Sequence, residues 1–418
     1  MVGDHGELLV DRQFQLVLLA NLMPPLGTAL LSPVLNSLVD PLGASQANVG
    51  LMMSAYTAPA IFMIPVAGLL ADRFGRRPVL VTGLLVFGIA GSTISFVDTF
   101  RLALGLRFLQ GIGFAALTPI LITVIGDRYT GAEETTAQGL RFTSSGVAQT
   151  VFPLASGLLV AIAWEYPFLL YALALPMAAV VAVRFEEPTE VGASDCPKQP
   201  LRDQLRDLWT LVSHRRGAGM ALARATPSIA WIGFLTYNSI VVAELIGGTA
   251  AHAGLLAGLG SMTYAIAASQ AGRVTDAFGR DLGPLVVLNL ALAGGFVIVF
   301  MVSTLPAAAF GILLVGIGFG LLSSIYRSLI TEMAPTSLRG SWVSFTEAVG
   351  RIAITLTPVG MGAGVAVAAP VMGYPAAVRL VGLGTGICVV LLGIGSVSLV
   401  AVSPTVTLAE TASRSLGD

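Results

Sequence analysis

The chain has 418 residues, of which 55% are hydrophobic and only 11% are charged. Soluble domains carry about 25% charged residues, so this composition excludes a water-exposed globular domain and predicts an integral membrane protein. The net charge of −1 gives no reason to expect nucleic acid as a partner. Cys196 and Cys388 lack the spacing of metal ligands, and we expect neither a metal nor another cofactor.

Apolar stretches long enough to cross a bilayer, about 20 residues each, recur along the whole chain. They predict twelve spans, at 14–36, 47–70, 78–97, 102–125, 139–163, 166–183, 218–244, 253–274, 284–304, 307–331, 341–367 and 375–402. We therefore expect an all-α membrane protein of two pseudo-symmetric six-helix bundles. The predicted parts are a first bundle, a cytoplasmic linker, a second bundle and a cytoplasmic tail, at 1–183, 184–217, 218–402 and 403–418.

Positively charged residues are concentrated on one side of these spans. With the amino terminus inside, the external loops carry only Arg101 and Arg379. The internal segments carry Arg73, Arg76, Arg77, Arg128, Arg184, Lys198, Arg202, Arg206, Arg215, Arg216, Arg273, Arg280 and Arg339. Cytoplasmic loops are enriched in Lys and Arg, so we expect a multi-pass plasma-membrane protein with both termini in the cytoplasm.

Two loop sequences show that the halves of the chain are related. The loop after the second span runs Gly68-Leu-Leu-Ala-Asp72-Arg-Phe-Gly75-Arg76-Arg77, and the loop after the eighth runs Gly272-Arg-Val-Thr-Asp276-Ala-Phe-Gly279-Arg280. The strings Gly111-Ile-Gly-Phe114 and Gly316-Ile-Gly-Phe319 form a second pair. A duplicated bundle predicts a binding site near the midplane between the repeats.

The first of these loops resembles the signature of the major facilitator superfamily, and the resemblance extends from about Phe14 to about Val402. It implies a transporter that moves a small molecule by alternating access. Within the superfamily the chain is most similar to the twelve-helix drug–proton antiporter branch, which implies efflux of a hydrophobic or amphipathic compound.

Three further motifs carry the likeness to that branch. The fourth predicted span contains Arg107-Phe-Leu-Gln110-Gly111. The first contains Leu26-Gly27 and then Pro33-Val34-Leu35, with Asn36 where a second proline is usual. The fifth-helix motif, Gly-Pro-x-x-Gly-Gly, is changed here to Phe152-Pro153-Leu-Ala-Ser156-Gly157, which leaves the direction of transport open.

The resemblance implies a latch at the loop pair. Asp72 and Asp276 would dock on the N-termini of the fifth and eleventh helices when the cytoplasmic side is closed, because helix N-termini carry unsatisfied N–H groups and partial positive charge. The glycines permit the tight turns, and Arg76 and Arg280 would pair with acids ending the fourth and tenth helices. The complete predicted latch is Gly68, Asp72, Arg73, Gly75, Arg76, Arg77, Asp276, Gly279, Arg280, Asp127 and Glu332. The alternative is that these arginines only set topology.

Charged residues inside spans are costly and usually face a cavity or a partner. The predicted coupling residues are Arg107, Gln110, Glu347 and Arg351. Alternatives stay open: Arg107 could snorkel outward, Glu347 and Arg351 could neutralise each other, and Arg224 and Arg327 could lie at the membrane interface. Asp40 is a second candidate for a proton-carrying carboxylate, and an uncoupled uniporter is a further possibility.

Polar residues within spans are candidates for the substrate cavity: Asn21, Asn36, Tyr56, Gln149, Tyr237, Asn238 and Tyr264. For any one of them, bonding between neighbouring helices is the competing role. Few charges fall in the spans, so we expect a mainly apolar cavity and a monomer that binds a small hydrophobic or amphipathic molecule, with protons as the candidate coupling ion. The histidines His5, His214 and His252 lie outside the span cores, which argues against an enzyme; a non-transporting sensor remains an alternative.

Overall fold

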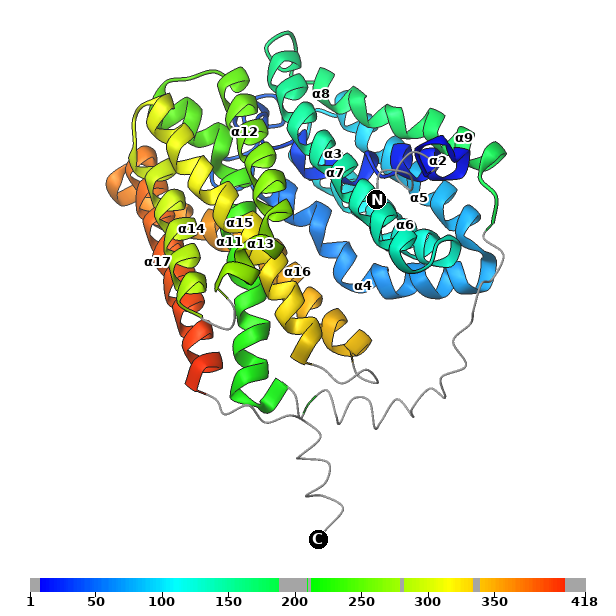
Figure 1. The fold of residues 1–418 in the computed structure, drawn as a ribbon. Coiled ribbons are helices and arrows are strands. Elements are labelled where there is room, and N and C mark those ends of the chain that lie inside the picture. Colours follow the sequence, from blue (N-terminus) through cyan, green and yellow to red (C-terminus); the bar gives the residue numbers. More distant parts are fainter. Residues whose placement is uncertain (1–7, 188–208, 210–211, 279–281, 334–338, 403–418) are drawn as a thin grey trace.

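The computed structural model describes residues 8–187, 209, 212–278, 282–333 and 339–402, and within these ranges every regular element is a helix. In Figure 1 the helices of the first half of the chain, blue to teal, lie on the right, and those of the second half, green to red, lie on the left. The predicted tail and most of the predicted linker lie outside the described residues.

The first half contains α2 (Arg12–Ala20), α3 (Met23–Ala29), the short 3-10 helix η1 (Leu35–Leu38), α4 (Leu51–Phe74) and α5 (Arg76–Thr93), which η2 (Ile94–Phe96) extends. It continues with α6 (Phe100–Arg128) and α7 (Gly131–Leu159). It ends with α8 (Tyr166–Leu169), η3 (Leu170–Leu173) and α9 (Ala174–Arg184), which follow one another without a gap.

The second half begins with α11 (Arg215–Ile240), which continues as the π-helix η4 (Val241–Ile246). It continues with α12 (Ala250–Ser269), α13 (Ala271–Phe278) and α14 (Gly283–Met301). The last helices are α15 (Leu305–Met333), α16 (Arg339–Met372) and α17 (Tyr374–Val402).

Among the described residues, nine helices are long and apolar enough to cross a membrane. They match nine of the twelve predicted spans, and large apolar side chains such as Phe62 and Val371 point outward from them, at 75% and 85% exposure. The three remaining predicted spans correspond to α2 with α3, which are separate short helices, to α7 and to α12.

The first predicted span, 14–36, is not one continuous helix. α2 ends at Ala20 and α3 begins at Met23 with prolines in its first turn. Proline lacks a backbone N–H and clashes with the carbonyl four residues earlier, so Pro24 and Pro25 are accommodated only where a new helix begins. After Ala29 the chain turns and forms η1.

The two ends of the bundle are named here by one landmark. The motif end is the end at which α4 passes into α5 through Gly75, and the distal end is the opposite one. Helices α7, α11 and α16 start at the motif end, whereas α15 ends there.

The halves approach each other most closely near the distal end. A Cβ on Gly157 of α7 would lie 2.5 Å from the carbonyl oxygen of Ala250, and a Cβ on Gly254 of α12 would lie 2.4 Å from that of Pro153. Small residues let helix backbones pack closely. The altered fifth-helix motif, Phe152 to Gly157, therefore lies in the contact between the two halves.

Side-chain hydrogen bonds that cross between the halves, within the described residues, lie in the same part of the bundle. Ser54 Oγ donates to the Thr355 carbonyl (2.7 Å), Thr355 Oγ1 donates to Thr57 Oγ1 (3.1 Å), and Tyr374 OH donates to the Gln46 carbonyl (3.2 Å). The halves are thus joined from about the middle of the bundle to the distal end.

Because Gly254 has no room for a side chain, Gly254→Leu should force α7 and α12 apart and open the distal end. We expect a cysteine introduced at Leu154, in the Cys196→Ser, Cys388→Ser background, to react several-fold faster with a membrane-impermeant maleimide. Gly294→Leu is the control, since a Cβ there meets nothing within 4 Å. Equal labelling rates in the two variants would contradict the packing described here.

Candidate functional site

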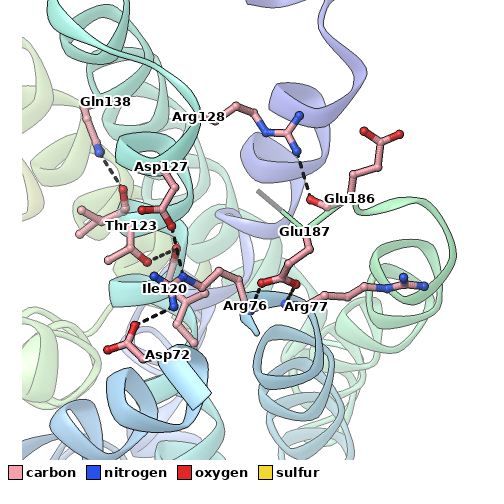
Figure 2. Close-up of polar contacts among 11 residues, drawn as sticks. Asp72, Arg76, Arg77, Ile120, Thr123, Asp127, Arg128, Gln138, Glu186 and Glu187 are labelled. Atoms are coloured by element: carbon pink, nitrogen blue, oxygen red, sulfur yellow. Dashed lines mark hydrogen bonds and ion pairs between the residues drawn. The ribbon is translucent and has the colours of Figure 1, made fainter. Parts of the chain in front are cut away.

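The loop between α4 and α5 forms a compact polar network at the motif end (Figure 2). Gly75 has a φ of 93°, a backbone conformation that favours glycine. Arg76 Nη1 donates to Asp72 Oδ1 at 2.7 Å, and Arg76 Nε donates to Asp127 Oδ2, at the end of α6, at 3.2 Å. The predicted contact between Arg76 and Asp127 is therefore present.

The segment after α9 completes this network in a way that the sequence analysis missed. The carboxylate of Glu187 accepts the backbone N–H groups of Arg76 and Arg77, so it caps the N-terminus of α5 (Figure 2). Arg77 donates to the Ala182 carbonyl, and Arg128 Nη2 donates to the Glu186 carbonyl at 3.1 Å. These contacts fix the start of the linker to the motif loop.

The remaining latch residues are less engaged. The Asp72 side chain is 69% exposed, and its hydrogen-bond partner within the described part of the chain is Arg76 of its own half. Arg73 is exposed and Gly68 is partly buried. In the second loop, Asp276 is exposed on α13, Gly279 and Arg280 lie outside the described residues, and Glu332 accepts a hydrogen bond from Ser328 at 3.1 Å.

Arg107 is fully buried inside the first half, so its predicted alternative, an outward-snorkelling side chain, is wrong. Its guanidinium donates to the carbonyls of Gly27 (2.6 Å) and Met52 (3.3 Å), to Gln110 Oε1 (2.6 Å) and to Tyr171 OH (3.2 Å). The Tyr56 ring lies 4.5 Å from its Cζ. All of these partners are neutral, so Arg107 and Gln110 hold α3, α4 and α6 together without a carboxylate.

Glu347 of α16 joins two other helices of the second half. Its carboxylate accepts two hydrogen bonds from Arg224 of α11, at 3.2 and 3.1 Å, and one from Arg327 of α15, at 3.2 Å. The predicted mutual pairing of Glu347 with Arg351 is therefore replaced by contacts between helices. Arg224 is only 9% exposed, so its predicted interfacial position is wrong.

Two more arginines belong to the same region. Arg351 is half-buried, has no side-chain hydrogen bond among the described residues, and interacts electrostatically with Glu347, Arg224 and Tyr56. Arg141 of α7, which the sequence analysis did not single out, interacts electrostatically with Arg327 across the two halves. A cavity of about 480 Å³ next to this region is lined by Ser324, Arg327, Ser328, Thr331 and Glu332.

Several predicted cavity residues bond neighbouring helices instead. Asn21 Nδ2 donates to the Arg141 carbonyl (2.8 Å) and to Ser144 and Ser145 on α7, and Tyr56 OH donates to the Pro24 carbonyl (3.1 Å). Asn238 Nδ2 donates to the Ala253 carbonyl (2.8 Å) and to Ser32 Oγ (3.3 Å).

Asn36 and Tyr237, two more of the predicted cavity residues, also contact other parts of the helical bundle near the distal end. The Asn36 N–H donates to Ser239 Oγ at 3.1 Å, and the Tyr237 ring packs on Phe300. Asn36 and Asn238 thus lie in the contact between the halves. Tyr237 lies inside the second half.

Gln149 and Tyr264 form another contact between the two halves. Gln149 Nε2 on α7 donates to Tyr264 OH on α12 at 2.6 Å. Tyr264 also belongs to an aromatic cluster with Trp231 of α11 and Phe319 of α15, whose ring centroids are 4.9–5.3 Å apart. This aromatic cluster closes the region of the arginines on its distal side.

A sequence model described as Major Facilitator Superfamily matches residues 17–358, which is most of the chain. The chain belongs to the major facilitator superfamily. The motif loop in Figure 2 is thus the superfamily signature that the sequence predicted.

Curated relatives in the superfamily are bacterial exporters and multidrug transporters. The bacillibactin exporter of Bacillus subtilis is 35% identical over 154 residues, which cover 35% of this chain and 38% of that protein. The multidrug transporter MdfA of Edwardsiella piscicida is 27% identical over 211 residues, covering 50% and 51%. The chain thus spans about half or less of the length of these two relatives.

Solved structures share the major facilitator fold over nearly the whole chain. A bacterial homolog of the human lysosomal transporter Spinster, in an inward-facing and unoccupied conformation, matches with a TM-score of 0.81 at 16% identity, covering 96% of this chain and 97% of that one. A point mutant of the nucleoside transporter NupG matches with a TM-score of 0.75 at 11% identity, covering 92% and 100%.

The Arg224–Glu347 pair can be tested by a double-mutant cycle. Glu347→Gln leaves the buried Arg224 without its anion and should lower the free energy of unfolding by about 1–3 kcal/mol, less than for a fully buried pair because Glu347 is partly exposed. With Arg224→Gln added, the total loss should be at least about 1 kcal/mol smaller than the sum of the single losses. Titration with SDS in mixed micelles measures both.

Glu332→Gln is the control for this cycle, because the Glu332 carboxylate is exposed and its one hydrogen bond comes from Ser328. It should change stability by no more than about 0.5 kcal/mol. Strictly additive losses in the Arg224 and Glu347 variants would show that the ion pair has no energetic role.

Proposed function

We propose that this superfamily member is a secondary transporter that exports a small amphipathic molecule by alternating access, with proton entry as the driving reaction. The observation that carries the proposal is the asymmetry between the ends. Within the described residues, the side-chain hydrogen bonds between the halves lie from the middle of the bundle to the distal end, whereas Arg224, Arg327 and Glu347 of the second half lie toward the motif end. Alternating access needs a site that is closed toward one end of the bundle and open toward the other.

The motif end is the cytoplasmic end in this proposal, because the positively charged loops lie there. The structure then corresponds to an inward-open state. The similar fold of the inward-facing Spinster homolog supports that assignment. The distal contact through Gly157 and Gly254 would be the external gate, and it would break when the carrier opens outward.

Asp72 is the proposed internal latch. In the inward-open state it is exposed and pairs, among the residues that the structure describes, with Arg76 alone, so it can dock on a helix N-terminus of the second half when the motif end closes. Such a contact is worth about 0.3–1 kcal/mol at an exposed site, which suffices to bias an equilibrium that must reverse in every cycle.

Glu347 is the proposed coupling carboxylate. Within the described residues it is the one Asp or Glu that lies more than about one helical turn from the end of its helix. It bridges Arg224 and Arg327, and coupling would require it to exchange these arginines for a proton during the cycle. Asp40, the alternative, is exposed near η1.

The nature of the relatives supports export. The bacillibactin exporter is named for export, the MdfA proteins are named as multidrug transporters, and CraA of Acinetobacter baumannii is named for chloramphenicol resistance. An uptake carrier, a uniporter or a non-transporting sensor would share the fold, because fold alone does not fix function.

Asp72→Asn should hold the carrier in the inward-open state, because an amide interacts more weakly with a helix N-terminus. A cysteine at Ser324, in the cysteine-free background, should react up to about fivefold faster with a maleimide in inside-out vesicles. Asp98→Asn, which neutralises an exposed aspartate at the distal end, should leave the rate unchanged. An unaltered rate in Asp72→Asn would refute the latch.

Proton coupling can be measured in proteoliposomes with pH gradients imposed in each direction. Protons that flow from the external to the cytoplasmic face should drive a transported dye the other way, so that the dye accumulates at the external face. Reversing the pH gradient should reverse the net flux of the dye. Glu347→Gln should abolish the response to the gradient while binding persists, whereas Asp40→Asn should respond normally. Loss of the response in Asp40→Asn alone would move the coupling site to Asp40, and rates that ignore the gradient would indicate a uniporter.

A further inference from the structure

The arginines around Glu347 outnumber the acids that could neutralise them. Arg224, Arg327 and Arg351 interact with the carboxylate of Glu347, and Arg141 interacts electrostatically with Arg327. The electrostatic neighbours of Arg141 and Arg351 among the described residues include no other acid. Four guanidinium groups face two carboxylates, those of Glu347 and of Glu332, which lines the cavity with Arg327. About two positive charges are therefore uncompensated in a part of the bundle where charge is costly.

Two of these arginines are available to a ligand. Arg351 makes no side-chain hydrogen bond or ion pair within the described residues although it is half-buried. Arg141 bonds only to neutral groups, Gln138 Oε1 at 3.0 Å and Asn21 Oδ1 at 3.2 Å, which orient it without neutralising it. A guanidinium presents a planar fork of N–H donors that matches a carboxylate or a phosphate.

Three of the four arginine-bearing helices also carry a residue of the aromatic cluster or Gln149, which donates to Tyr264 of that cluster. On α7, Gln149 follows Arg141 by two turns; on α11, Trp231 follows Arg224 by two turns; and on α15, Phe319 precedes Arg327 by two turns. Two turns keep side chains on one face and separate them by about 11 Å along the axis. The arginines and the aromatic cluster are therefore two layers of one surface, the arginine layer being nearer the motif end.

We propose that this surface is an anion-binding site, and that the transported molecule is an organic anion with an aromatic or apolar body. Its acidic group would bind Arg141 and Arg351 beside the cavity lined by Arg327, and its apolar body would pack on Trp231, Phe319 and Tyr264. The inference rests on the proposed transport function and adds the charge of the substrate. It departs from the mainly apolar cavity expected from the sequence, because the arginines come from four helices and meet only in the fold.

The test uses three probes of similar size and different charge: 2-naphthoate, 2-naphthamide and 2-naphthylmethylammonium. Binding to the purified full-length protein in nanodiscs is measured by calorimetry at neutral pH. We expect naphthoate to bind at least about tenfold more tightly than naphthamide, which corresponds to one well-placed charge contact, and the ammonium probe to bind most weakly. Equal or tighter binding of the amide or the ammonium probe would overturn the proposal, as would failure of naphthoate to bind.

Substitutions of the two arginines test whether naphthoate binds at the proposed site. Arg141→Gln and Arg351→Gln should each weaken naphthoate binding about tenfold and leave naphthamide binding unchanged, and Arg351→Lys should restore part of the loss. Arg101→Gln, which removes an exposed arginine at the other end of the bundle, is the control. Naphthoate affinity that survives both Gln substitutions would overturn the site.

Binding needs no transport, so the two proposals can fail separately. Selective naphthoate binding without any flux in proteoliposomes would refute the carrier and leave the anion site. Gradient-driven flux of a cationic dye without naphthoate binding would leave the carrier and refute the anion site.

Discussion

A charged side chain inside the membrane-spanning part of this protein is costly unless a polar partner meets it, because lipid offers none. Arg107 shows how fully this constraint can be met, since carbonyl groups, Gln110 and Tyr171 surround its guanidinium in the first half. The second half meets it by bringing Arg224 and Arg327 to Glu347. The two halves share a fold but differ in their buried charges. In the first half Arg107 has neutral hydrogen-bond partners, and in the second half several arginines surround Glu347 and leave an excess of positive charge.

The close contact between the halves depends on glycine residues, which have no side chain to keep the helices apart. Gly157 and Gly254 let α7 and α12 meet backbone to backbone near the distal end. A contact of this kind has little interdigitation, so it can separate without unlocking large side chains. The polar network around Gly75 differs, since Glu187 and Asp127 tie it to its own half. These contacts hold the motif end of the first half together as one unit.

The sequence was sufficient for the fold and for the motif loop, because both depend on local patterns. Span length and hydropathy predict helices, and the Gly68–Arg77 string predicts the contact of Arg76 with Asp127. It was insufficient where partners come from distant helices. Arg224 was expected at the membrane interface, and Arg141 was not considered. The partners of these side chains lie on other helices, so they are known only when the packing of α7, α11, α15 and α16 is known. Glu187 was missed because a capping residue 110 positions away leaves no sequence signal.

Alternating access between the two halves is the central claim, and paired distance measurements test it most directly. One spin-label pair at Gly139 and Gly272 would report the motif end, and a second pair at Asp98 and Thr304 would report the distal end. Electron–electron resonance distances should change in opposite directions when a transported ligand or a pH change shifts the population. Distances that stay fixed at both ends, or that grow and shrink together, would contradict the account.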